Sequence, residues 1–218
     1  MNHAAAGRVL GPGPPPATPL PPQPLGVPWP GLEWPTGSLD HTVDEHRVEA
    51  LLDTAFPDPA HGPFGLSLAT VIVHRGRLVA ERYGPTAGPE EPLISWSMAK
   101  SFTHAAVGLL VADGLLDVEA PAAVPEWQGQ DDARAQITID HLLRMVSGLE
   151  FNEDYVDGET SHCLEMLWGD DAHLDMATYA ASQQLLHRPD TAFNYSSGTT
   201  NIVSRLVADQ VGRGDDYA

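Results

Sequence analysis

The sequence contains one pair of β-strand patterns, and every later regular pattern is helical. The runs 66–73 (LSLATVIV) and 78–83 (LVAERY) are rich in apolar and β-branched residues, and residues 74–77 (HRGR) join them. This arrangement predicts an antiparallel hairpin. An isolated hairpin is only marginally stable in water, so the sheet needs further strands from another chain or from a longer polypeptide. We favour the second interpretation and expect these 218 residues to be the front part of a longer protein.

Four helical patterns follow the hairpin, and three of them stop at a glycine, a residue that readily ends a helix. They span residues 98–113, 139–147, about 173–186 and about 199–211. A long acidic loop is expected between 149 and 171. The predicted fold class is therefore α+β, with one N-terminal hairpin and a mainly helical region.

The N-terminal part of the chain is rich in proline. Residues 11–36 hold 11 of the 20 prolines, and proline lacks the backbone N–H that helices and central strands require. We predict a proline-rich tail or strap over residues 1–39 and a globular domain over residues 40–218. Trp29 and Trp34 lie near the end of the proline-rich segment, which suggests that this end packs on the domain.

The overall charge and the single cysteine limit the partners and the cellular compartment that we expect for this protein. The formal net charge of −19 argues against nucleic acids and anionic membrane surfaces as partners. No apolar run approaches the roughly 18 residues of a membrane span. Proline and glycine follow Arg8 where a signal peptide needs an apolar stretch, and Cys163 alone cannot form an intramolecular disulfide. We therefore expect a cytoplasmic protein.

The only lysine of the chain, Lys100, lies three residues after Ser97 in the sequence SMAK. At the start of a helix this spacing places the hydroxyl and the amine on one face, and the helix N-terminus favours an oxyanion at an acylated serine. Lysine, unlike arginine, can lose its proton and act as a base. The pattern alone describes equally well a helix-capping serine beside a surface lysine.

A second candidate group is Tyr195 in the sequence FNYSSG (193–198). A turn signal (RPD, 188–190) precedes it and a helical pattern follows, so we expect Tyr195 in a short loop. A phenol beside an ammonium group can transfer protons. The alternative is a tyrosine packed at a helix junction, with its hydroxyl bonded to the backbone.

These motifs resemble the serine β-lactamase and penicillin-recognising superfamily. The resemblance rests on SMAK (97–100), KSFTHAAVGLLVADGLLDVEAP (100–121), ITIDHLLRMVSGLEF (137–151) and YSS (195–197). It spans roughly residues 40–212 and is closest to the class C-related branch, which includes 6-aminohexanoate-dimer hydrolases and carboxylesterases. It implies a β-lactamase/transpeptidase-like fold, of which this chain carries the N-terminal part, with the rest of the antiparallel sheet missing.

The resemblance also implies roles for individual residues. Ser97 would be the nucleophile, Lys100 its base and Tyr195 the second proton-transfer residue. Ser197, where class C β-lactamases have asparagine, would help to orient Lys100 and the substrate, and Tyr155 is a candidate substrate contact. The implied function is cleavage of a small-molecule amide or ester through an acyl-enzyme, without a metal or organic cofactor. The serine at 197 favours the esterase and amide-hydrolase relatives over the β-lactamases.

One motif of that superfamily is absent from the sequence. A later strand of these proteins carries Lys or His, then Ser or Thr, then Gly, and residues 1–218 contain no such tripeptide. This absence agrees with an incomplete domain. It also leaves an alternative open, in which the chain is a truncated and inactive relative that serves at most as a binding module.

Other sequence features are weaker candidates for a catalytic or metal-binding site. The segment 65–69 (GLSLA) approaches a nucleophile elbow but lacks the second glycine. His104 shares a helix face with Ser97, although a partly buried helix histidine is the simpler interpretation. A group of polar residues between 162 and 173 matches no zinc-binding spacing: His162, Cys163, Glu165, Asp170, Asp171 and His173. We interpret Cys163 as structural, and we interpret the neighbouring acids as a solvated loop: Glu150, Glu153, Asp154, Asp157 and Glu159.

Overall fold

The structure is a computed structural model that describes residues 8–9, 19, 21–57, 62–129, 131–155, 161–169 and 175–213. The chain forms two compact units. One unit comprises residues 15–94, and the other comprises residues 95–218 together with residues 1–14.

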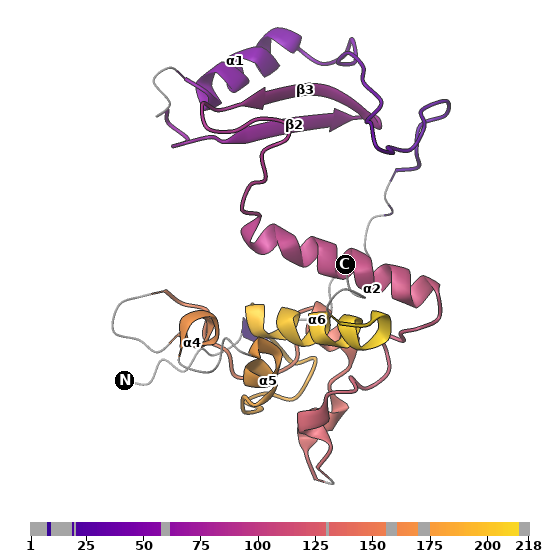
Figure 1. Ribbon diagram of the computed structural model, residues 1–218, viewed down its shortest axis with the longest axis vertical. Helices are drawn as coiled ribbons and strands as arrows, with labels where there is room; N and C mark the ends of the chain where they lie inside the picture. Colours follow the sequence, from indigo (N-terminus) through magenta and orange to yellow (C-terminus); the bar gives the residue numbers. More distant parts are fainter. Residues whose placement is uncertain are drawn as a thin grey trace. The chain divides into compact units, whose positions relative to one another are not determined.

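The unit of residues 15–94 is built on the hairpin predicted from the sequence (Figure 1). Strand β2 (Ala69–His74) pairs antiparallel with β3 (Arg77–Tyr83), so the expected hairpin is confirmed with slightly shifted ends. Arg75 and Gly76 form the turn with φ values of 51° and 74°. Two successive left-handed residues match the right-handed twist of the flanking strands, which is why tight hairpin turns favour them.

Helix α1 (Glu45–Ala55) lies beside this hairpin and was not predicted from the sequence. It begins after Asp44, whose carboxylate accepts a hydrogen bond from the backbone of the first helical turn. Glu49 of α1 forms an ion pair with Arg82 of β3, at 2.6 Å. Leu52 is the only described residue of α1 that is fully buried, so the helix lacks the apolar periodicity by which a sequence pattern is recognised.

The end of the proline-rich segment runs along β3. The Leu78 backbone N–H donates to Pro35 O at 2.7 Å, and the Gly37 N–H donates to Leu78 O at 3.0 Å. The backbone therefore attaches this segment to the hairpin. Trp29 and Trp34 are 75% and 50% exposed, so the packing expected of the two indole rings is not what holds the segment.

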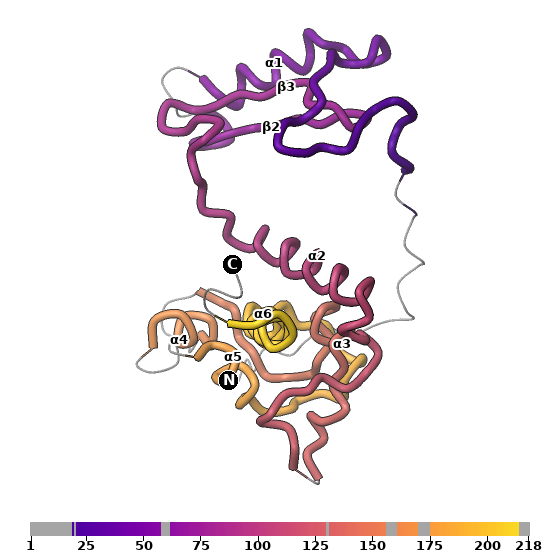
Figure 2. Tube along the Cα trace, turned by 45° about the vertical axis from the view of Figure 1, so that its right-hand side comes forward, coloured from indigo at the N-terminus to yellow at the C-terminus, as the bar shows by residue number. Residues whose placement is uncertain are grey.

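The unit of residues 95–218 is mainly helical, and helix α6 (Ser197–Val211) contacts every other α-helix described in it. Figure 2 shows α6 nearly end-on among the helices that contact it: α2 (Ala99–Ala112), α3 (Ile139–Leu143), α4 (His162–Trp168) and α5 (Met176–Ala181). Three short 3₁₀ helices complete the helical elements: η1 (Trp96–Met98), η2 (Pro125–Trp127) and η3 (Ala133–Gln136). Across the described ranges, no helix combines the length and apolar character needed to cross a membrane.

A small antiparallel pair of strands, β1 (Arg8–Val9) and β4 (Ala192–Phe193), also belongs to this unit. Neither strand was predicted from the sequence, because two residues are too few to show a period. β4 leads directly into the loop that carries Tyr195, so this pairing joins the N-terminal region to the segment before α6.

The core of the helical unit is centred on Trp127, which has no exposed surface. Its indole Nε1 donates to Ala181 O at 2.8 Å, so the buried polar group is satisfied. Apolar residues of α2, α3 and α6 pack in the same cluster, among them Val107, Leu110, Ile139, Leu142, Ile202, Val203 and Leu206. This core fixes the N-terminal end of α6 relative to α2, and the site described next lies there.

In the helical unit, two of the predicted helices are shorter than expected, and α4 was missed in addition to α1 of the other unit. The helix predicted over 139–147 ends at Leu143, because Met145 adopts a left-handed φ of 61°. The helix predicted from about 173 to 186 covers only Met176–Ala181 among the described residues. The loop expected over 149–171 contains α4, which begins where Ser161 Oγ accepts a hydrogen bond from the Leu164 N–H at 3.2 Å.

Candidate active site

Ser97 lies in the 3₁₀ turn η1, immediately before α2, and its side chain is exposed. The preceding residue, Trp96, has a φ of 45°, a left-handed conformation that costs energy for any residue with a side chain. Backbone strain of this kind concentrates at functional sites. The local chain thus presents the Ser97 hydroxyl at the N-terminal end of a 14-residue helix.

Lys100 is in the first turn of α2, and its amine lies close to two serine hydroxyls. Nζ donates to Ser97 Oγ at 3.1 Å and to Ser197 Oγ at 3.0 Å. It also lies 4.8 Å from the centre of the Tyr195 ring, within range of a cation–π interaction. The three-residue spacing predicted from the sequence therefore brings the amine and hydroxyl together on one helix face.

Tyr195 is in the short loop between β4 and α6, as expected from the surrounding turn and helix signals. Its hydroxyl donates to Ser97 Oγ at 2.7 Å. The loop is fixed on both sides of the tyrosine. The Asn194 side chain donates to Phe151 O at 2.8 Å, and the buried Ser196 caps α6 by accepting from the Thr199 N–H at 3.0 Å.

Ser197 is the first residue of α6, and a carboxylate binds it twice. Ser197 Oγ donates to Glu153 Oε1 at 2.5 Å, and the Ser197 backbone N–H donates to Glu153 Oε2 at 2.6 Å. The interpretation of Glu153 as a solvated loop residue is therefore wrong, since it is partly buried and bonded to a residue 44 positions away. No sequence signal separates Glu153 from Glu150 and Asp154, so only the folded chain identifies it.

The four residues Ser97, Lys100, Tyr195 and Ser197 thus form one hydrogen-bonded group, to which Glu153 is added. Ser97 Oγ receives hydrogen bonds from both an amine and a phenol. Such an arrangement can remove a proton from a serine hydroxyl on one side and return one to a leaving group on the other.

Tyr155, the fifth predicted site residue, is 62% exposed and bonds elsewhere. Its hydroxyl lies 3.2 Å from Cys163 Sγ. This hydrogen bond, together with partial burial, raises the pKa of the Tyr155 phenol. No hydrogen bond joins Tyr155 to Ser97 in the described structure, so its role as a substrate contact stays a prediction.

Cys163 is buried on α4, and burial raises the pKa of its thiol. A raised pKa disfavours the thiolate that a cysteine nucleophile requires. The geometry is consistent with the interpretation of Cys163 as a structural residue, because it is buried and its sulfur contacts the Tyr155 hydroxyl.

No described hydrogen bond joins the weaker sequence candidates below to this group. Residues 65–69 belong to the other unit and lead into β2. His104 is exposed on α2 and makes no described hydrogen bond to Ser97. His162 Nδ1 accepts from the Asn152 N–H at 2.8 Å. No three potential metal ligands come together among the described residues, and Asp170, Asp171, His173, Asp157 and Glu159 lie outside them.

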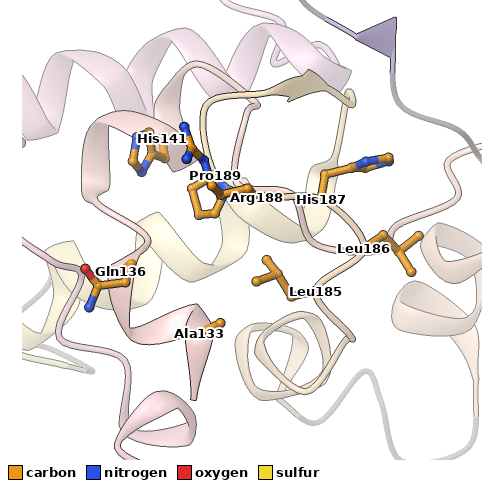
Figure 3. Close-up of a pocket in the computed structure, with 8 residues that line it drawn as sticks. All are labelled: Ala133, Gln136, His141, Leu185, Leu186, His187, Arg188 and Pro189. Atoms are coloured by element: carbon orange, nitrogen blue, oxygen red, sulfur yellow. The ribbon is translucent and has the colours of Figure 1, made fainter. Parts of the chain in front are cut away.

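An open pocket of about 550 Å³ lies on another part of the helical unit (Figure 3). It is lined by Ala133, Gln136, His141, Leu185, Leu186, His187, Arg188 and Pro189. None of the five predicted site residues lines it. One of the two histidines that line it, His141, accepts the Thr138 N–H at 3.1 Å as part of a helix cap. The hydrogen-bonded group around Ser97 is therefore the stronger candidate for chemistry.

A hairpin followed by a mainly helical region with a Ser-x-x-Lys pair near its start is the arrangement expected of a β-lactamase-like fold. The comparison with known families agrees. Residues 61–215 match the family described as Beta-lactamase, and the chain belongs to this family. Its members are typically serine hydrolases.

Two solved structures share the fold. A Bacillus anthracis protein provisionally described as a 6-aminohexanoate-dimer hydrolase matches with a TM-score of 0.60 and 19% identity, over 83% of this chain and 49% of its own. A Bacteroides dorei protein provisionally described as a β-lactamase matches with a TM-score of 0.57 and 21% identity, over 78% of this chain and 47% of its own. The chain thus spans about half the length of these structures, and the predicted α+β fold is confirmed for the part it contains.

Proposed function

We propose that the protein is a serine hydrolase that cleaves a small-molecule amide or carboxylic ester through an acyl-enzyme on Ser97. The observation that carries this proposal is the convergence of two proton-transfer groups on one oxygen. Lys100 Nζ and the Tyr195 hydroxyl lie 3.1 Å and 2.7 Å from Ser97 Oγ. Membership of a family of serine hydrolases supports the same chemistry.

In the acylation step, Ser97 Oγ forms a bond to the substrate carbonyl carbon. Its proton passes to the neutral amine of Lys100, and the carbonyl oxygen becomes an oxyanion. The backbone N–H groups and the dipole of α2 favour negative charge at its N-terminal end, where Ser97 lies. Trp96, which directly precedes Ser97, has a left-handed φ of 45°.

When the tetrahedral intermediate collapses, the bond between the carbonyl carbon and the leaving amine or alcohol breaks. The Tyr195 hydroxyl, which lies 2.7 Å from Ser97 Oγ, supplies a proton to the leaving group. Lys100 then returns its proton to the Tyr195 phenolate, which lies beside it. Water attacks the acyl-enzyme in a second cycle that regenerates the Ser97 hydroxyl.

The residue at position 197 bears on the substrate class. Ser197 presents a hydroxyl that is already committed to Glu153 and Lys100, whereas an asparagine would offer an amide to the substrate. This supports simple amides and esters over β-lactams as substrates. The fold shared with a protein described as a 6-aminohexanoate-dimer hydrolase is compatible with an amide substrate.

The test is hydrolysis of a p-nitrophenyl ester by the full-length protein, with Ser97→Ala as the critical variant. We expect this variant to lose at least about 10³-fold in kcat/KM, because the nucleophile is gone. Ser101→Ala, an exposed serine on the same helix, is the matched control and should retain the wild-type rate. Wild-type turnover by Ser97→Ala would overturn the proposal.

The p-nitrophenyl ester assay also tests the alternative that the sequence leaves open. In that alternative the chain is an inactive relative that acts as a binding module. That alternative predicts no burst of p-nitrophenol from the wild-type protein at any enzyme concentration. A burst equal to the concentration of folded protein contradicts it.

A further inference from the structure

Glu153 is held in the site by the two residues that precede it, Phe151 and Asn152, which are both anchored to neighbouring segments. Phe151 is buried, and its carbonyl accepts the Asn194 side chain at 2.8 Å. The Asn152 N–H donates to His162 Nδ1 at 2.8 Å, and Asn152 O accepts from the Cys163 N–H at 3.2 Å. The loop before Glu153 therefore cannot move away from α4 and α6 without breaking these contacts. The carboxylate is preorganised against the first residue of α6.

The hydrogen bonds of Ser197 can run in only one direction. A carboxylate accepts hydrogen bonds and donates none, and a serine hydroxyl has a single proton. The proton of the Ser197 hydroxyl is therefore committed to Glu153 Oε1. The lone pairs of the same oxygen remain for Lys100 Nζ, at 3.0 Å, so the amine must be the donor in that contact.

This direction matters for the base. As described, Nζ donates to both serine oxygens. To act as the base, the amine must be neutral, with two N–H bonds and one lone pair, and its contact with Ser97 Oγ must reverse so that the lone pair faces that oxygen. A contact in which Ser197 donated to Nζ would occupy the lone pair with the wrong hydroxyl. By holding the Ser197 proton, Glu153 excludes that arrangement and leaves the lone pair to Ser97.

We propose that Glu153 is a positioning residue of the active site, which acts through Ser197 to keep the lone pair of Lys100 directed at Ser97. The proposal rests on the function proposed above, since it concerns the base of the same reaction. Glu153 touches neither Ser97 nor Lys100 through a described hydrogen bond. The hydrogen bonds that link Glu153 to the base therefore run through Ser197.

Glu153→Gln tests this direction with almost no change in shape. The Ser197 backbone N–H can only donate, so it requires the amide oxygen of the glutamine. The amide nitrogen then faces Ser197 Oγ and donates to it. The Ser197 proton is released and can turn to the Lys100 lone pair, which reverses the contact that the wild-type carboxylate enforces.

The measurement is the acylation rate constant of the full-length protein with a p-nitrophenyl ester, taken from the burst phase, with KM determined in parallel. We expect Glu153→Gln to lower acylation by about 10- to 100-fold, with KM changed by less than about twofold, because only the alignment of the base is lost. Asp154→Asn removes the same charge from the next, exposed residue and should acylate like the wild type. Thermal unfolding midpoints of both variants show that the fold is retained.

A double-mutant cycle separates positioning from a general weakening of the fold. Ser197→Ala removes the group through which Glu153 acts, and we expect it to lower acylation by a factor similar to that of Glu153→Gln. In the Ser197→Ala background, Glu153→Gln should then have no further effect on the rate. If Glu153 had only a structural role, the losses in acylation rate of the two single variants would multiply in the double variant. The thermal unfolding midpoint would then fall together with the rate.

The outcomes for the two proposals are distinct. A wild-type burst that Ser97→Ala abolishes and Glu153→Gln leaves unchanged would overturn the role of Glu153 and preserve the proposed function. Wild-type acylation by Ser197→Ala would likewise overturn the role of Glu153. Absence of any burst from the folded wild-type protein would overturn both proposals.

Discussion

The Tyr195 hydroxyl and Ser97 Oγ lie 2.7 Å apart, although the two residues are separated by 98 positions in the chain. Two packed helices create this relationship. Ser97 precedes α2, Tyr195 precedes α6, and α2 and α6 pack against each other through buried residues such as Val107 and Val203. The packing of α2 against α6 therefore sets the distance between Ser97 and Tyr195.

Tyr195→Phe should impair catalysis without harming the fold. The Tyr195 hydroxyl bonds only Ser97 Oγ among the described residues, and the ring is 40% exposed. We expect kcat for a p-nitrophenyl ester to fall by about 10²- to 10³-fold, because the leaving group loses its proton donor. The thermal unfolding midpoint should stay within error of the wild type. A variant with unchanged kcat would show that Tyr195 is a packing residue.

Lys100→Arg should be nearly as damaging as Lys100→Met. The guanidinium keeps the positive charge and can still donate to Ser197, but it cannot accept the Ser97 proton. We expect both variants to lose about 10²- to 10⁴-fold in the acylation rate constant. Burst kinetics of the two variants measure this. A Lys100→Arg protein with a rate near the wild type would show that the charge, rather than the proton acceptance, is what the reaction needs.

Gly198→Ala should disturb both the fold and the site. A Cβ at Gly198 would clash with Cε2 of Phe151 and would lie 2.9 Å from Cβ of Ala180, so the start of α6 would have to move. We expect a loss of about 1–3 kcal/mol in the free energy of unfolding, measured by urea denaturation. Ester hydrolysis should fall as well, because Ser197 directly precedes Gly198 and Tyr195 lies three residues before it.

Gly108→Ala in the middle of α2 is the control for that substitution. A Cβ at Gly108 meets no atom within 4 Å, and alanine favours a helix over glycine by about 0.5–1 kcal/mol. The free energy of unfolding should therefore rise slightly for Gly108→Ala and fall for Gly198→Ala. Equal effects of the two substitutions would contradict the close approach of Gly198 to Phe151.

Glu126→Gln should destabilise the protein in a pH-dependent way. The Arg205 guanidinium, which donates to Glu126 Oε2 at 2.7 Å and is 9% exposed, holds the pKa of this carboxyl below the ordinary value of 4.5. Because the folded state has the lower pKa, the stabilisation is present above about pH 4.5 and is lost as the pH falls through the folded pKa. Near pH 7 we expect a loss of about 3 kcal/mol, since a nearly buried guanidinium would be left unpaired.

Urea denaturation at a series of pH values measures this difference. Wild type and Glu126→Gln should converge in stability below the folded pKa of Glu126. Glu119→Gln, an exposed carboxyl without a described side-chain partner, is the control and should show no such difference. A constant gap between Glu126→Gln and the wild type at every pH would indicate a loss of packing rather than of an ion pair.

The hairpin and helix α2 could be predicted from the sequence because their apolar residues recur with the period of the element. The strands were expected over 66–73 and 78–83 and lie at 69–74 and 77–83, and α2 departs from its expected range by one residue at each end. α1 and α4 were missed, since they are held by capping side chains and long-range contacts rather than by a strong apolar stripe.

The site could be predicted in part, because the three-residue spacing of Ser97 and Lys100 places both side chains on one face of a helix. Tyr195 and Ser197 could be assigned to the site only through the family resemblance, because that resemblance links motifs that lie far apart in the chain. Glu153 could not be found from the sequence. Its importance comes from two hydrogen bonds to a residue 44 positions away, and its neighbours along the chain are acidic as well.

The most direct test of the account is the location of the covalent intermediate. The full-length protein is treated with a fluorophosphonate, which reacts with activated serine hydroxyls, and the modified peptide is identified by mass spectrometry. The account predicts one added group per folded molecule, on Ser97, and none on the Ser97→Ala protein. A stable modification on another residue, with Ser97 unmodified in an active protein, would contradict it.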